Sequence, residues 1–221
     1  MRQFFGMSQS GNLAEAVRGL DRPQFIMLLS NHAQFEAHVK NLEALYPGIP
    51  SIGCIGMSYD DRIVENGVGV VAFLDGVAAA ANVLEEVSTV PVKYIERLER
   101  DLAKAGGTER DTVCIDLCSG NDACVLSTIY SVLGPRKISL VGGTGDAGLV
   151  SANGVVYHDA VAYAIVRNLR GRVKTYKENI YHPLGDYRFI ASHTDRANYI
   201  LGSLNGKPAK QVYESILHVT D

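Results

Sequence analysis

Short apolar runs alternate with amphipathic helical segments over the first two thirds of the chain, and this alternation limits the fold more than any other feature. The runs short enough for buried strands are residues 24–30, 51–57, 112–117 and 138–141. The segments with helical patterning are residues 32–46, 92–106 and 123–134. Strands separated by helices predict an α/β fold, a layered domain built on a mixed β-sheet.

The last third of the chain has a different pattern. After Asn153–Gly154 the segments are β-branched or alternate between apolar and polar residues, as in residues 155–169 and 186–193. Such segments, separated by turn residues, predict an antiparallel meander, and α+β is the alternative fold class. Earlier in the chain, Asn66–Gly67 predicts a hairpin between two strand-like runs. The sequence shows no internal repeat. We place the domain boundary within Gly171–Gly185.

Charge and hydropathy exclude two classes of partner. The 221 residues carry 21 basic and 24 acidic side chains, a formal charge of −3, so we expect no nucleic-acid partner held by electrostatics. No apolar stretch reaches the length of a membrane span, and residues 1–12 lack the apolar core of a signal peptide. We therefore expect a cytoplasmic chain with no membrane span, in which the four cysteines stay reduced.

The densest signal for ligand binding is the segment Gly142–Gly148, which follows an apolar run and has four glycines in seven positions. Glycine adopts positive φ and lets backbone amides approach a ligand closely. The segment lacks the lysine of a Walker loop and the following helix of a dinucleotide fingerprint. We favour a ligand-lining role for Gly142, Gly143, Thr144 and Asp146 over a simple tight turn.

A second candidate segment, Asp116–Asp122, also follows a strand-like run and precedes a helical one. Ligands of open α/β sheets bind at the carboxyl ends of strands and at helix N-termini. If the two preceding strands are parallel neighbours, both segments line one cavity, where Cys118, Ser119, Gly120 and Asn121 would face an anionic group. A plain helix cap at Ser119 or Asn121 is an equally good interpretation.

Positive evidence for enzyme chemistry is missing from the sequence. It contains no HExxH or GxSxG motif, and its cysteines lack the CxxC spacing of zinc and iron–sulfur sites. We therefore predict no catalytic residue, no metal site and no cofactor. The least favoured alternative is an enzyme with Cys118 as nucleophile. Haem is an alternative cofactor, since one imidazole can hold its iron; the candidate ligands, in falling order, are His182, His193 and His158.

The order of these motifs resembles the FIST sensory-domain family. Ile52–Cys54 is similar to the family's glycine–cysteine strand, and Val141–Asp146 to its loop of two glycines, a small residue and Gly-Asp. Asn153–Val161 resembles the hairpin that follows. Pro183–Gly185 and Ser192–Tyr213 resemble the junction into the C-terminal half of FIST proteins. The resemblance runs over nearly the whole chain.

The resemblance implies a sensory module in residues 1–180, followed at residues 181–221 by the start of a truncated C-terminal FIST half. FIST modules are attached to chemotaxis transducers, histidine kinases or cyclic-di-GMP enzymes of bacterial signal transduction. Amino acids or similar small polar metabolites are the ligands proposed for them. Other members of the family bind haem and respond to nitric oxide, which gives the alternative function.

The resemblance also carries over residue roles. It implies that Cys54, Gly142, Gly143 and Asp146 line or shape a pocket. Ile55–Ser58 departs from the family's hydroxyl-rich continuation, so the resemblance carries over no hydroxyl contact at these positions. The partners expected are a small-molecule ligand and an output module or kinase, and a homodimer is left open.

Overall fold

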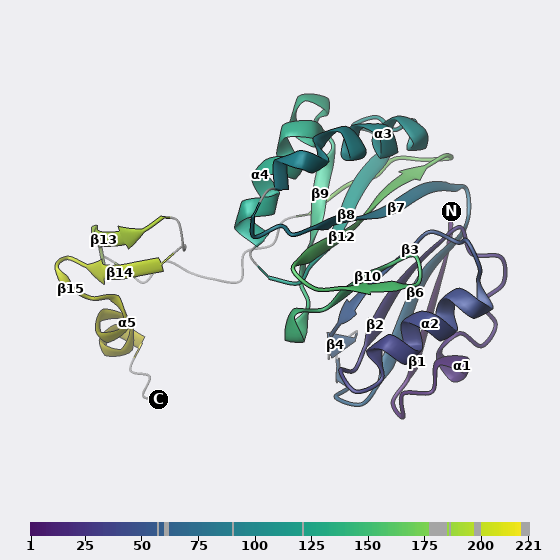
Figure 1. The fold of residues 1–221 in the computed structure, drawn as a ribbon, viewed down its shortest axis with the longest axis horizontal. Helices are drawn as coiled ribbons and strands as arrows, with labels where there is room; N and C mark the ends of the chain where they lie inside the picture. Colours follow the sequence, from purple (N-terminus) through teal and green to yellow (C-terminus); the bar gives the residue numbers. More distant parts are fainter. Residues whose placement is uncertain are drawn as a thin grey trace. The chain divides into compact units, whose positions relative to one another are not determined.

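The structure is a computed structural model that describes residues 1–56, 58–59, 62–89, 91–120, 122–176, 185, 187–196 and 200–217. The chain forms two compact units, Met1–Thr175 and Tyr176–Asp221 (Figure 1). The match of the second unit to the start of a C-terminal FIST half, with a boundary after residue 180, stays a prediction.

The first sheet of the larger unit has six strands in the order β1-β6-β2-β3-β10-β11. Their bounds are β1 (Arg2–Ser8), β2 (Phe25–Ser30), β3 (Ser51–Ile55), β6 (Val68–Asp75), β10 (Val150–Ala152) and β11 (Val155–Tyr157). The strands β2 and β3 are parallel because α2 (Phe35–Leu45) carries the chain back between them, whereas all other pairs are antiparallel. The short helix α1 (Leu13–Ala16) joins β1 to β2.

The second sheet has four strands in the order β7-β12-β8-β9. Their bounds are β7 (Val77–Glu85), β8 (Thr112–Cys118), β9 (Ser139–Thr144) and β12 (Ala160–Asn168). The parallel strands β8 and β9 are joined by α4 (Asp122–Leu133) and the 3₁₀ turn η2 (Gly134–Arg136). Between β7 and β8 lie the 3₁₀ turn η1 (Pro91–Tyr94) and α3 (Ile95–Ala105), which ends at Gly106 in the left-handed conformation, as its glycines predict.

The two sheets lie face to face, and two helices cover the outer face of each (Figure 1). The alternation of side chains along β12 explains this arrangement. Val161, Tyr163 and Ile165 pack under α3 and α4, whereas Ala162 and Ala164 face the first sheet, and all five are fully buried. Because alanine is small, the sheets can approach closely. The predicted layered α/β fold with a mixed sheet is confirmed.

The two sheets have the same topology, although the amino-acid sequence shows no internal repeat. Reading along the chain, β1-α1-β2-α2-β3-β6 corresponds to β7-α3-β8-α4-β9-β12. The corresponding strands have the same order and the same directions in the two sheets. Each repeat also contains a short hairpin between its last two corresponding strands, formed by β4 (Ser58–Tyr59) and β5 (Arg62–Ile63) in the first and by β10 and β11 in the second.

Backbone hydrogen bonds at the strand ends repeat with the topology. The N–H of Gly56, after β3, donates to Ser30 O at 3.1 Å, and the N–H of Gly145, after β9, donates to Cys118 O at 2.8 Å. Gly56 and Gly145 therefore occupy equivalent positions, each one residue beyond the parallel pair of its repeat.

The predicted hairpin at Asn66–Gly67 is wrong. The strand after it, β6, pairs with β1 and β2, whereas the preceding β5 pairs with β4. Asn66 lies in a turn before β6 that Asn31 stabilises, because the Asn31 side-chain amide donates to Asn66 O at 3.0 Å and to Gly67 O at 3.1 Å. A long-range side-chain contact, which the local sequence does not reveal, thus stabilises the turn before β6.

The smaller unit contains a three-stranded antiparallel sheet and one helix. Its elements are β13 (Ala191–Asp195), β14 (Ile200–Leu204), β15 (Lys207–Pro208) and α5 (Ala209–Leu217). The helix follows the Asn205–Gly206 turn, as the sequence predicts. Within this unit, Ile190, Ile200 and Tyr213 are exposed.

Among the residues that the structure describes, we find no helix long and apolar enough to cross a lipid bilayer.

The alanines between the sheets give the first testable prediction. We expect Ala164→Leu to lower the free energy of unfolding by about 1–3 kcal/mol, because the contact between the sheets has no room for the added atoms. Chemical denaturation measures the change. Ala37→Leu, on the exposed side of α2, is the matched control and should stay within about 0.5 kcal/mol of the original protein. Equal stability of the two variants would contradict this account of the core.

Candidate functional site

The two candidate segments meet at one edge of the second sheet. In the parallel pairing of β8 with β9, Asp116 lies opposite Gly142, and Cys118 lies opposite Thr144. One residue further, the N–H of Gly145 donates to Cys118 O at 2.8 Å. The glycine-rich segment and the segment before α4 are therefore direct neighbours, as expected for the carboxyl ends of parallel strands.

Ser119 links the carboxyl end of β8 to the central strand β12 by two hydrogen bonds. Its N–H donates to Ala160 O at 3.0 Å, and its hydroxyl oxygen accepts the Ala160 N–H at 2.8 Å. The next residue, Gly120, has φ of +144°, in the range that favours glycine. Asn121, the fourth predicted residue of this segment, lies outside the described residues. Ser119 thus has a structural role, and its hydroxyl proton can still be donated to a ligand.

The glycine-rich loop begins at Gly145, three residues later than the sequence predicts. Gly142, Gly143 and Thr144 belong to β9, because pairing with β8 continues to Thr144. A Cβ at Gly142 would collide with the backbone and the carboxylate of the buried Asp116, whereas a Cβ at Gly143 would meet no heavy atom within 4 Å. The first glycine therefore makes room for Asp116, and the second leaves open, exposed backbone.

The loop after β9 connects the two sheets at Cys54. It passes through Gly145 and the 3₁₀ turn η3 (Asp146–Gly148) and enters β10 beside β3. A Cβ on Gly145 would lie 2.7 Å from the Cβ of Cys54, so only glycine fits at this approach. Burial, and secondarily the negative charge of Asp146, raise the pKa of the Cys54 thiol to about 12. Cys54 therefore stays a neutral thiol that supports the loop.

Cys54 and Cys118 do not line one cavity. Cys54 packs between the sheets, whereas Cys118 points to the opposite face of the second sheet, under the helices. The Sγ of Cys118 is buried and lies 3.5 Å from an oxygen of Asp116, with the thiol as donor. Among the described residues, Cys54, Cys114 and Cys118 form no disulfide. Burial keeps a substrate away from Cys118, which argues against its alternative role as a nucleophile.

The histidines proposed as haem ligands belong to different units of the chain. His158 is exposed between β11 and β12, and His193 is exposed on β13 in the other unit. A haem group needs an apolar enclosure around its axial ligand, and neither of these side chains is enclosed. His182 lies outside the described residues. Among those that are described, no three His, Cys, Asp or Glu side chains group in a way that could hold a metal ion.

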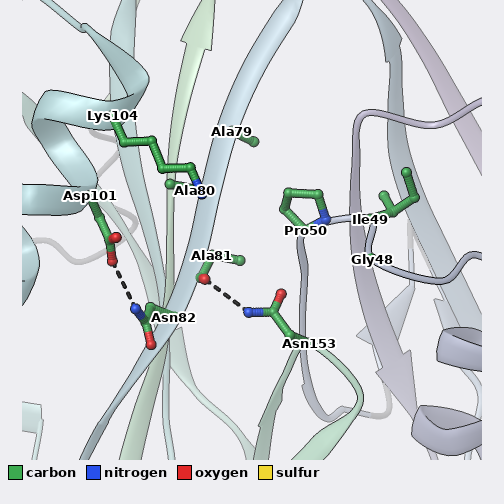
Figure 2. A pocket seen from close by; sticks show the side chains of 10 residues that line it. All are labelled: Gly48, Ile49, Pro50, Ala79, Ala80, Ala81, Asn82, Asp101, Lys104 and Asn153. Atoms are coloured by element: carbon green, nitrogen blue, oxygen red, sulfur yellow. Dashed lines mark hydrogen bonds between the residues drawn. The ribbon is translucent and has the colours of Figure 1, made fainter.

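The larger unit contains a hollow of about 210 Å³ that none of the sequence motifs indicates (Figure 2). It lies between the loop Gly48–Pro50, the strand residues Ala79–Asn82, α3 and Asn153. None of the predicted site residues lines it. The run of four alanines in β7 was a usable signal, because small side chains in a strand leave space beside it.

Two comparisons with known proteins bear on the chain. The family model of the FIST N domain matches residues 24–207, which is most of the sequence. The search of the curated proteins found no match.

The contact between Gly145 and Cys54 predicts how alanine substitutions at two nearby glycines change the free energy of unfolding. We expect Gly145→Ala to lower the free energy of unfolding by about 1–3 kcal/mol, because its Cβ collides with that of Cys54. Gly143→Ala, two residues earlier in open space, should change it by less than about 0.5 kcal/mol. Chemical denaturation compares the two.

A second substitution tests the cause of the destabilisation. Cys54→Gly removes the side chain that the new methyl group meets, so the cost of Gly145→Ala should shrink when it is introduced into the Cys54→Gly protein. If the two effects simply add, the collision is not the source of the destabilisation.

Proposed function

The chain belongs to the FIST N domain family, whose members are generally sensory domains of signal transduction, and from this premise we propose that it senses a small polar metabolite. The ligand we propose first is an amino acid. Its site is the edge formed by the carboxyl ends of β8 and β9. The residues proposed to line or support the site are Cys54, Cys118, Ser119, Gly120, Asn121, Gly142, Gly143, Thr144 and Asp146.

One observation carries the proposal: Asp146 and the backbone that leads into α4 lie at the same edge of the second sheet. The hydrogen bond from Gly145 to Cys118 brings the residue after each, Asp146 and Ser119, to the same end of the strand pair. A Cβ on Gly148 would lie 3.6 Å from Ser119 O, so the turn η3 runs alongside Ser119.

The two charges suit a zwitterion. The first turn of α4 carries partial positive charge and suits a carboxylate. Asp146 is exposed and suits an ammonium group. The exposed backbone at Gly143 lets a small molecule approach β9 without a side chain in the way. An α-amino acid carries both charges on neighbouring atoms.

The same loop offers a route for a signal. Because η3 leads from the second sheet into β10 of the first, a ligand held by Asp146 contacts the segment that joins the sheets. Binding shifts a conformational equilibrium only if the ligand prefers one of its states. We propose that the output is a chemotaxis transducer, a histidine kinase or a cyclic-di-GMP enzyme. The chain itself acts by binding, without turnover of the ligand.

A thermal-shift screen of amino acids and organic acids tests this function. A ligand present at 100 times its Kd adds about 2.7 kcal/mol of stability, which raises the melting temperature measurably. For any amino acid that binds, we expect Asp146→Asn to weaken binding about tenfold or more, since it removes the partner of the ammonium group.

Asp21→Asn is the control for Asp146→Asn. Asp21 is exposed and precedes β2, at the amino end of the strands and away from the proposed site. Isothermal titration calorimetry should give this variant the affinity of the original protein. Absence of a shift with every amino acid, or unchanged affinity in Asp146→Asn, would refute the proposal.

A further inference from the structure

The hollow beside β7 has the features of a second ligand site, and nothing in its argument rests on the proposed function. β7 is an edge strand of the second sheet, with β12 as its one neighbour in that sheet. The backbone groups on its other side would be unpaired unless other parts of the chain cover them.

Side chains cover this edge at both ends. The N–H of Val77 donates to Gln24 Oε1 at 3.0 Å. Toward the other end, the N–H of Val83 donates to Asn82 Oδ1 at 2.9 Å, and Val83 O accepts from Arg97 Nη1 at 2.7 Å. Val77 and Val83 are odd-numbered, so the odd-numbered residues of β7 direct their backbone groups away from β12.

A gap in this cover lies at the hollow. Asn153 donates its side-chain amide to Ala81 O at 2.9 Å (Figure 2). By the same alternation, the N–H and C=O of Ala79 and the N–H of Ala81 point outward. In the part of the chain that the structure describes, none of these three groups has a hydrogen-bond partner outside the sheet. They form the donor and acceptor pattern that pairs with an amide group.

Asp101 supplies a fixed negative charge beside this gap. Its Oδ2 accepts from Asn82 Nδ2 at 3.0 Å and from the hydroxyl of the buried Tyr163 at 2.6 Å. Its other oxygen, Oδ1, has no hydrogen bond to the described residues. The two bonds hold the carboxylate in place while leaving one oxygen for a ligand.

Lys104 supplies the opposite charge, one helical turn further along α3. Its side chain extends from the helix toward β7 (Figure 2). Among the described residues no carboxylate lies within ion-pair distance of its ammonium group. Residues three apart on a helix face the same side, so both charges of α3 border the hollow. The Pro50 ring lies on the other side of the hollow as an apolar wall.

We propose that this hollow binds a dipeptide. The peptide group pairs with the uncovered edge of β7 at Ala79 and Ala81, the ammonium group with Asp101 Oδ1, and the carboxylate with Lys104. A free amino acid has both charges but no amide for the strand edge. Small side chains suit the 210 Å³ volume and the walls formed by alanine and Pro50.

The experiment is a titration of the ¹⁵N-labelled protein with L-alanyl-L-alanine, followed by NMR. We expect the amide signals of Ala79 and Ala81 to shift with the dipeptide, and its affinity to exceed that of L-alanine at least tenfold. Lys104→Gln should weaken dipeptide binding about tenfold, because it removes the partner of the carboxylate. Lys40→Gln, at an exposed position on α2, should leave the affinity unchanged.

Each outcome decides the proposal. Unshifted amides at Ala79 and Ala81, equal affinity for alanine, or equal effects of the two lysine variants would overturn it. The spectrum of each variant shows whether its fold is intact. Asp146→Asn should not change dipeptide binding, so the amino-acid site at β9 and the dipeptide site at β7 succeed or fail independently.

Discussion

The close contact between the two sheets is the constraint on which the rest of the larger unit depends. Ala162 and Ala164 of the central strand β12 face the first sheet without exposed area, and their small size keeps the sheets near each other. Only at such proximity can the short turn η3 carry the chain from one sheet into the other. The ligand site is proposed at the start of this turn. The close packing of the alanines therefore also determines where Asp146 lies.

The repeated topology explains why similar motifs occur twice. Gly53 and Gly142 occupy equivalent positions in β3 and β9, and each lies against the neighbouring parallel strand, where a Cβ would be crowded. The following residues differ, because Cys54 fills the space between the sheets and Gly143 leaves it open. Apart from these glycines, β3 and β9 have different residues, which is why the repeat is not visible in the amino-acid sequence.

The sequence predicted those parts of the fold that depend on local pattern. Hydrophobic periodicity located the buried strands and the main helices, and the adjacency of β8 and β9 followed from the strand–helix–strand order. The pairing of β6 was mispredicted because its partner strands, β1 and β2, are not its neighbours in the sequence. The sequence marked the glycine-rich segment Gly142–Gly148, but it did not reveal that Gly145 is required by the Cβ of Cys54 on the other sheet. The unpaired backbone groups at Ala79 could not be predicted either. They stand out only because side chains from distant parts of the chain bond to other backbone groups along this edge of β7.

The two repeats differ at the carboxyl ends of their parallel strands, and this difference argues for ligand binding in the second. In the first repeat the end of β2 is filled from within: Ser30 Oγ bonds to His38 Nδ1 at 2.7 Å, and His38 Nε2 bonds to Gly11 O at 2.8 Å. Burial lowers the pKa of His38, which favours its neutral form in this network. At the equivalent end of β8 the buried Cys118 thiol bonds to Asp116, and the neighbouring strand β9 has exposed backbone at Gly143. The exposed backbone of β9 at Gly143 thus marks the end of the second repeat, beside which we propose that a ligand binds.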